Sequence, residues 1–213
     1  MAMPHSRMHS ESGSPPLPER PIWTVDDLEQ LPDDGNRYET LYGELLVTPL
    51  PSSGHQCVAV NLVMAIGAWC RAHTGWAIRA PGGVYISRTV WLEPDVVVYP
   101  APHMTKRPWK ELPTPVFVVE VASPSTRKRD RHGKRPAYLS NGVGEVWLVD
   151  ENTRTVERWT SASEFPETMR DTFTWAPDAA HPPMIMTADE LFGPSREIDD
   201  AHDDAHDDAH DNE

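Results

Sequence analysis

The chain has 213 residues, a length typical of one compact domain with tails. Hydrophobic residues make up 38% of it and 22 residues are proline, which indicates an ordinary core combined with polar, Pro-rich segments. No run approaches the ~18 apolar residues of a membrane span, and the N-terminus lacks the apolar region of a secretory signal. We therefore expect a soluble, cytoplasmic protein with no membrane partner.

The formal net charge of −14 is concentrated at the C-terminus. Residues 197–213 hold nine acids and no lysine or arginine, and the tetrapeptide AHDD repeats there. The rest of the chain is only mildly acidic, so its charge is weak evidence against a nucleic-acid partner. Because neither end has the composition to build a core, we expect disordered segments at 1–21 and 194–213 and one folded domain at 22–193.

The two cysteines and several absent motifs exclude common classes of site. Cys57 and Cys70 fall on one predicted helix, where they would be separated by roughly 20 Å of rise, too far for a disulfide. They are expected to be free thiols, as in a reducing compartment. No CxxC, HExxH, GxSxG or P-loop motif is present. This argues against common zinc, serine-hydrolase and NTPase sites.

The first third of the chain predicts a short helix, a hairpin and a long helix. Thr24 has the character of an N-cap for a helix through Leu31. The sequence RYETLYGELLVTPL alternates as a hairpin, with Gly43 near its bend. The segment 54–73 is the best helix candidate, because its apolar residues recur at helical spacing.

A strand-rich region follows. Strands are predicted at 76–80, 83–88, 94–99, 115–121, 145–150 and 155–160. The strand 115–121 (PVFVVEV) is strongly apolar and β-branched, so we expect it to be central. A polar helix is predicted at 126–141, although Pro136 lies inside it. Residues 161–196 indicate only a short helix at 188–192. The fold class predicted is α/β (α+β), a mixed sheet flanked by helices.

Two carboxylates fall on these apolar strands. Asp95 opens one strand, and Glu120 lies inside another, where an unpaired charge would be very costly. If the strands are neighbours, the two acids could converge on one divalent cation. Mg²⁺ favours such a site, since it binds one or two carboxylates, several waters and substrate phosphate oxygens. Alternatively, Asp95 caps a turn and Glu120 forms a structural salt bridge.

A cationic segment directly follows Glu120. Its Lys and Arg residues, which oppose the single acid Asp130, are Arg127, Lys128, Arg129, Arg131, Lys134 and Arg135. They occupy the first turns of a predicted helix, where the helix dipole favours acids. Cations at the start of a helix, where acids are preferred, are unfavourable, and such an unfavourable arrangement beside a buried carboxylate is typical of a functional site. Two acids, a metal ion and nearby cations would suit phosphodiester cleavage, although any one arginine could belong to an ordinary solvated helix face.

These motifs resemble the Uma family of restriction endonucleases, a branch of the PD-(D/E)XK nuclease superfamily. The resemblance extends from about Trp23 to Phe192. It depends on LPDDGNRYETLYGEL, SSGHQ, EPDVVVYP, VVEVASPSTRKRDRHGKRPAYLSNGV and EVWLVD. It implies a restriction-endonuclease-like fold and a Mg²⁺- or Mn²⁺-dependent endonuclease that hydrolyses DNA. A homodimer would suit the cutting of both strands of a palindrome.

The resemblance also assigns residues. The PD of the superfamily signature falls on Pro94-Asp95, and the (D/E)XK element begins at Glu120. Its third position is Ala122 instead of lysine, and the matching lysine is Lys134 on the following helix. Asp95 and Glu120 are then expected to bind Mg²⁺ or Mn²⁺, helped by the carbonyl of Val121. Lys134 is expected to orient or help deprotonate the attacking water, or to stabilise the charge that develops on phosphorus.

Further residues have weaker assignments. Glu39 matches an additional early acid of the family, as an auxiliary ligand, with Glu44 on the same hairpin as the alternative. Gln56 matches a polar position at the start of the long helix. The histidines show no ligand spacing, so His55 is expected to be an ordinary polar residue at the surface or at a helix end. The residues expected to hold DNA phosphates are Arg127, Lys128, Arg129 and Arg131.

Three other functions stay open from the sequence. The domain could keep the nuclease fold without catalysis and bind DNA or protein. It could be a metal-binding interaction protein that uses the His/Asp tail, although that tail is more simply a solvated acidic segment. It could also hydrolyse RNA or a damaged nucleic acid. The presence of Asp95, Glu120 and Lys134 together favours the enzyme over the inactive module.

Overall fold

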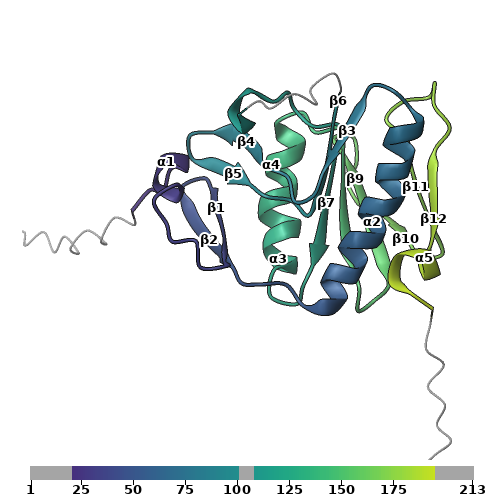
Figure 1. Ribbon diagram of the computed structural model, residues 1–213, viewed down its shortest axis with the longest axis horizontal. Coiled ribbons are helices and arrows are strands. Elements are labelled where there is room, and N and C mark those ends of the chain that lie inside the picture. Colours follow the sequence, from purple (N-terminus) through teal and green to yellow (C-terminus); the bar gives the residue numbers. More distant parts are fainter. Residues whose placement is uncertain (1–20, 101–107, 195–213) are drawn as a thin grey trace, which may run out of the picture.

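The computed structural model describes residues 21–100 and 108–194 (Figure 1). The disorder expected at both ends, including the acidic repeat, falls almost entirely on residues outside these ranges. No helix in the described ranges combines the length and the apolar character needed to cross a membrane.

A six-stranded mixed sheet forms the centre of the molecule. Its order is β10 (Glu167–Met169), β9 (Thr155–Thr160), β8 (Glu145–Asp150), β7 (Phe117–Ala122), β6 (Val96–Pro100) and β3 (Trp76–Arg79). β7 pairs in parallel with β8 and antiparallel with β6, and every one of its residues is buried. The central place predicted for this apolar strand is therefore confirmed.

A smaller antiparallel sheet adjoins the central one. Its order is β2 (Glu44–Thr48), β1 (Arg37–Leu41), β5 (Val90–Leu92) and β4 (Val84–Ser87). The predicted hairpin is confirmed as β1 and β2, and it turns through Tyr42 and Gly43, which both have positive φ. The single strand expected at 83–88 is instead the first arm of a hairpin whose second arm, β5, was not predicted.

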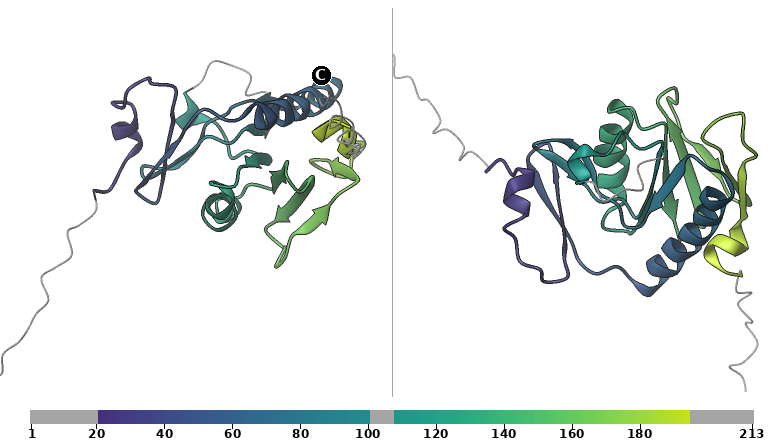
Figure 2. Two further views of the ribbon diagram at one scale, coloured as in Figure 1. Left: turned by 90° about the horizontal axis from the view of Figure 1, so that it is seen from below. Right: turned by 45° about the horizontal axis from the view of Figure 1, so that its top comes forward.

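Helices cover the two faces of the central sheet (Figure 2). The predicted long helix is confirmed as α2 (Ser53–Ala72), and it packs on one face. On the other face lies a helical segment made of α3 (Arg127–Arg129), a π-helical turn at Asp130–Lys134 and α4 (Arg135–Ser140). The alternation of a strand divides β7 between the two cores, so that Val119 faces α2 whereas Val118 faces Tyr138 of α4.

The remaining elements close the α2 side and the N-terminal end. The hairpin of β11 (Thr172–Trp175) and β12 (Met184–Thr187) packs beside α2 and is followed by α5 (Ala188–Phe192), the helix predicted there. The two short helices at the other end are α1 (Val25–Leu28) and η1 (Trp109–Glu111). Sequence reasoning missed β10, β11 and β12, since these short strands lie in a Pro-rich region that obscures their pattern. Both cysteines are free, as expected.

Candidate active site

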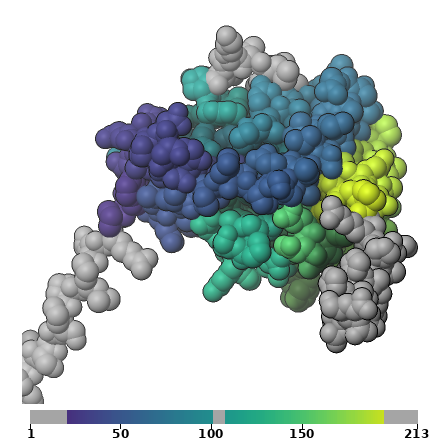
Figure 3. Space-filling view, turned by 60° about the horizontal axis from the view of Figure 1, so that its bottom comes forward, coloured from purple at the N-terminus to yellow at the C-terminus, as the bar shows by residue number. Residues whose placement is uncertain are grey.

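The pairing of β6 with β7 brings Asp95 and Glu120 to one place. Val96 lies opposite Val119 in this antiparallel pair. Asp95 directly precedes Val96, and Glu120 directly follows Val119. Because the strands are antiparallel, these two acids also lie opposite each other and project from the same face of the sheet. Both line a cavity of about 390 Å³, together with the start of α2 and the segment after β7. Figure 3 shows this side of the molecule, where the blue stretch containing the start of α2 adjoins the teal-green stretch of α3.

Glu120 is almost completely buried, with a relative exposure of 3%. Its Oε1 accepts a hydrogen bond of 2.7 Å from the hydroxyl of Tyr138 and lies 3.3 Å from Nζ of Lys134. Burial raises the pKa of Glu120 to about 8, and the charge of Lys134 opposes that rise only in part. A carboxylate kept in such an environment, in a cavity, is a candidate functional group.

Lys134 joins Glu120 to Glu39 of β1. Its Nζ lies 2.7 Å from Oε2 of Glu39, whose Oε1 accepts the backbone N–H of Glu93 at 2.7 Å. Burial alone would lower the pKa of Lys134, but the neighbouring carboxylates outweigh it and raise that pKa. Glu39 is fully buried and does not line the cavity, whereas Glu44 is exposed. Glu39 therefore acts in this structure as a partner of Lys134.

Asp95 is held by a guanidinium, an imidazole and one backbone N–H. Its Oδ1 lies 3.1 Å from Nη1 of Arg37 and 3.2 Å from Nε2 of His55. Its Oδ2 accepts the backbone N–H of Val121 at 2.8 Å. Burial alone would raise the pKa of Asp95, but the hydrogen bond and charge of His55, followed by Arg37, hold that pKa below its usual value.

Sequence reasoning missed His55 and Arg37. His55 lies in the first turn of α2, as expected, but it also lines the cavity and contacts Asp95, which was not predicted. Its position in SSGHQ, at the start of the long helix, was the available signal. The neighbouring Gln56 is exposed and does not line the cavity. On a helix, successive side chains point about 100° apart, so only one of the two faces the carboxylates.

The four cations expected to hold DNA are not in the cavity. Arg127 pairs with Asp150 at 2.5 Å, and Arg131 pairs with Glu157. These two ion pairs lie at a separate hollow of about 310 Å³. Arg129 donates to the hydroxyl of Thr48, and Lys128 is exposed. Of the four residues predicted to bind phosphate, Arg127 and Arg131 thus have their charges neutralised by acids of β8 and β9.

The helical segment after β7 contains a π turn at Asp130–Lys134, two residues before Pro136. Pro136 has no N–H, and in an α-helix its ring would collide with the carbonyl four residues earlier. The helix is wider at this point, because the N–H of Arg135 bonds to the carbonyl of Asp130, five residues earlier. Pro136 then falls in the first turn of α4. Asp130 and Lys134, at the two ends of the π turn, are both buried and both line the cavity. Asp130 was not predicted as a site residue.

The charges of this cluster suit one divalent cation. The carboxylates of Glu39, Asp95, Glu120 and Asp130 face two permanent cations, Lys134 and Arg37. When all are ionised, the cluster carries two negative charges in excess, and such an excess is costly in a buried site. In the described ranges, no group of three or more His, Cys, Asp or Glu side chains is arranged to hold a metal ion. A Mg²⁺ site needs only one or two carboxylates, so Asp95 and Glu120 fit this metal.

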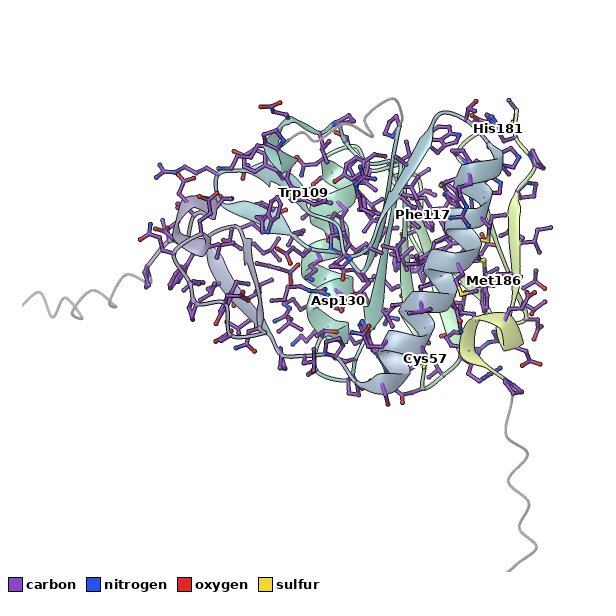
Figure 4. All side chains as sticks on the ribbon, viewed as in Figure 1. Cys57, Trp109, Phe117, Asp130, His181 and Met186 are labelled. Carbon is purple, nitrogen blue, oxygen red and sulfur yellow. The ribbon has the colours of Figure 1, made fainter. Side chains whose placement is uncertain are left out.

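A larger cavity lies elsewhere and lacks this chemistry. It has a volume of about 630 Å³ and is lined by α1, Trp91, Trp109 and Arg37. Figure 4 shows Trp109 well away from Asp130. Because two buried acids, Asp95 and Glu120, converge in the smaller cavity beside buried Lys134, we place the candidate site there in spite of the smaller volume.

Known proteins share the fold and the family of this chain. The chain resembles a crystal structure described as "a putative nuclease belonging to DUF820" from Anabaena variabilis, with a TM-score of 0.66 and 18% sequence identity. The similarity covers 80% of this chain and 97% of the other chain, and at this identity it shows a common fold. No curated protein matches the chain. A family model described as "Putative restriction endonuclease" matches residues 25–182, and the chain therefore belongs to the Uma2 family.

Proposed function

We propose that this protein is a Mg²⁺- or Mn²⁺-dependent endonuclease that hydrolyses phosphodiester bonds of DNA. The observation that carries the proposal is the convergence of Asp95 and Glu120 in one cavity, with Lys134 3.3 Å from Glu120. Membership of a family described as restriction endonucleases, and a fold shared with a nuclease-like structure, support DNA as the substrate.

Asp95 and Glu120 would hold the metal ion, with the carbonyl of Val121 as a further oxygen ligand. A bound divalent cation would supply Lewis-acid stabilisation of charge on the phosphate oxygens. Arg37 and His55 fix the Asp95 carboxylate through Oδ1, and the Val121 N–H fixes it through Oδ2. Carboxylate oxygens have two lone pairs each, so these contacts orient Asp95 without exhausting its capacity to bind a cation.

Lys134 would act as a positive charge beside the scissile phosphate. Its ammonium is a donor to the surrounding carboxylates, and Glu39 anchors it from outside the cavity. A fixed ammonium in a low-dielectric site stabilises the extra negative charge that develops on phosphorus during hydrolysis. Of the cations outside the cavity, exposed Lys128 is the best placed to contact the DNA backbone.

The test is Mn²⁺ binding followed by DNA cleavage, for the full chain and for Glu120→Ala. Both proteins keep the His/Asp tail, so metal bound by the tail cancels in the comparison. We expect the wild type to bind one more Mn²⁺ by calorimetry and to nick supercoiled plasmid, whereas Glu120→Ala does neither and keeps its far-ultraviolet circular dichroism. Equal metal binding and equal cleavage by the two proteins would refute the proposal. DNA binding without metal binding or cleavage would favour the inactive DNA-binding module.

We also propose a homodimer in the cytoplasm. A two-fold dimer would place two such sites on the two strands of a palindrome. The free thiols of Cys57 and Cys70 are consistent with a reducing compartment. Light scattering of the purified chain tests the first proposal, and cell fractionation tests the second.

A further inference from the structure

Hydrolysis of a phosphodiester by water needs a group that accepts a proton, and Lys134 is poorly suited to this task. Its Nζ is surrounded by Oε2 of Glu39 at 2.7 Å, Oε1 of Glu120 at 3.3 Å and Oδ1 of Asp130 at 3.9 Å. An ammonium that faces three carboxylates is a donor and has no free lone pair. The proton acceptor is therefore another group that lines the cavity.

Asp130 has the geometry of that acceptor. Its side chain is 97% buried and lines the same cavity as Asp95 and Glu120. Its Oδ1 has no hydrogen-bond partner among the described residues. Buried polar atoms are nearly always hydrogen-bonded, to protein or to an ordered water. Because Asp130 lines a cavity large enough to hold water, an ordered water there would supply the missing partner of Oδ1.

We propose that Asp130 is the general base that receives the proton of the attacking water. This inference rests on the nuclease function proposed above. The water would bind between Oδ1 of Asp130 and the scissile phosphate, with Lys134 beside it. The π turn places the Asp130 carboxylate and the Lys134 ammonium together at the wall of the cavity.

Water and the phosphodiester are the only reactants of this step. An O–H bond of the water breaks and its proton passes to Oδ1 of Asp130, while the water oxygen forms a new bond to phosphorus. The bond between phosphorus and the leaving oxygen breaks, and that oxygen takes a proton from solvent. Asp130 then returns its proton to solvent, so that no oxidant or further reactant is required. Burial raises the pKa of the Asp130 carboxyl, which makes its carboxylate a stronger base than an exposed one.

The experiment compares Asp130→Asn and Asp130→Ala with wild type and with the control Asp189→Asn. Asp189 is an exposed acid of α5 that pairs with Arg154, so its change removes a carboxylate of equal size away from the cavity. Plasmid nicking is measured under saturating Mn²⁺, and Mn²⁺ binding is measured by calorimetry. We expect Asp130→Asn to lower kcat on the order of 100-fold, the usual contribution of a general base, with KM for DNA and Mn²⁺ affinity nearly unchanged.

Chemical rescue separates a base from a merely structural acid. Asp130→Ala leaves space for a small carboxylate, so added formate should restore part of the cleavage rate relative to chloride at equal ionic strength. Formate should have no effect on Asp130→Asn, where the amide fills the space, or on Asp189→Asn.

The outcomes are distinguishable from failure of the proposed function. If wild type nicks DNA and Asp130→Asn nicks it at the same rate, the assignment of Asp130 is wrong and the nuclease function stands. If Asp130→Asn loses Mn²⁺ binding together with activity, Asp130 is a metal ligand instead of a base. If wild type itself nicks neither plasmid nor single-stranded DNA, the nuclease function and the role of Asp130 fail together.

Discussion

Nζ of Lys134 lies 2.7 Å from Oε2 of Glu39, which joins the helical segment after β7 to the hairpin of the smaller sheet. Both side chains are buried, and Oε1 of the same glutamate accepts the N–H of Glu93. Of the two acids of the hairpin, Glu39 is therefore the one that contacts the candidate site, because Glu44 is exposed to solvent. It also connects the stability of the small sheet to the position of the lysine in the candidate site.

Glu39→Ala should therefore destabilise the fold and impair the site. The change leaves a buried lysine with one partner fewer and a backbone N–H without an acceptor, and breaking such a pair costs about 3–5 kcal/mol. The measurement is the free energy of unfolding by urea denaturation. Glu44→Ala, an exposed change on the same hairpin, is the control and should stay within about 0.5 kcal/mol of wild type. Equal effects of the two variants would show that the contact with Lys134 contributes nothing.

Glu120 should make the metal-free protein less stable as the pH rises. Its pKa is raised to about 8 in the folded state from 4.5, so the folded protein binds a proton that the unfolded chain has lost between these values. The stability that protonated Glu120 contributes is therefore fully present below about pH 4.5 and is lost as the pH rises through about 8. Urea denaturation in the presence of a chelator should show this decline. Glu120→Gln cannot titrate, and its curve should be flatter over the same interval; parallel curves would contradict the assignment.

Tyr138→Phe should reduce both stability and cleavage. The variant loses the hydroxyl that donates to Oε1 of Glu120 at 2.7 Å, a bond to a carboxylate worth about 1.5–3 kcal/mol when the group is ionised. The matched control is Tyr99→Phe, because the buried hydroxyl of Tyr99 donates to the carbonyl of Gly83 at 2.6 Å, outside the cavity. Both variants should lower the free energy of unfolding, but only Tyr138→Phe should also slow plasmid nicking.

Arg37→Met should increase the dependence of stability on metal. The guanidinium offsets the charge of Asp95 at 3.1 Å, so its removal leaves a buried carboxylate less compensated. A bound Mn²⁺ would take over part of that compensation, and binding to the folded state alone stabilises it. Thermal unfolding with and without Mn²⁺ should give a larger rise in Tm for Arg37→Met than for wild type. An equal or smaller rise would place the cation away from Asp95.

Lys128 and Arg131 should differ in their effect on DNA affinity. Lys128 is exposed, whereas Arg131 is paired with Glu157. A lysine that contacts a phosphate releases a counterion, so Lys128→Ala should weaken DNA binding and reduce the salt slope by about one. Arg131→Ala should leave the salt slope unchanged. Fluorescence anisotropy over a range of salt concentrations measures both, and a larger change for Arg131→Ala would reverse this assignment.

Several features of this protein follow from local sequence. The apolar run PVFVVEV determined a central buried strand, the apolar periodicity at 54–73 determined α2, and Gly43 marked the turn of the hairpin. The position of Glu120 inside that strand also marked it as an acid that needs a partner. Each of these depends on neighbours within a few residues, which is why pattern and turn chemistry suffice.

Tertiary structure alone decided which groups meet Asp95 and Glu120. His55, Arg37 and Asp130 reach the cavity from three separate elements, and no local pattern specifies contacts between residues so far apart in the chain. The π turn needs Pro136 and the packing of α4 together, and the strands β10 to β12 are too short to be recognised without the core they cover. Burial supplies the remaining property, since a raised pKa is a consequence of lost solvent, which only the folded chain imposes.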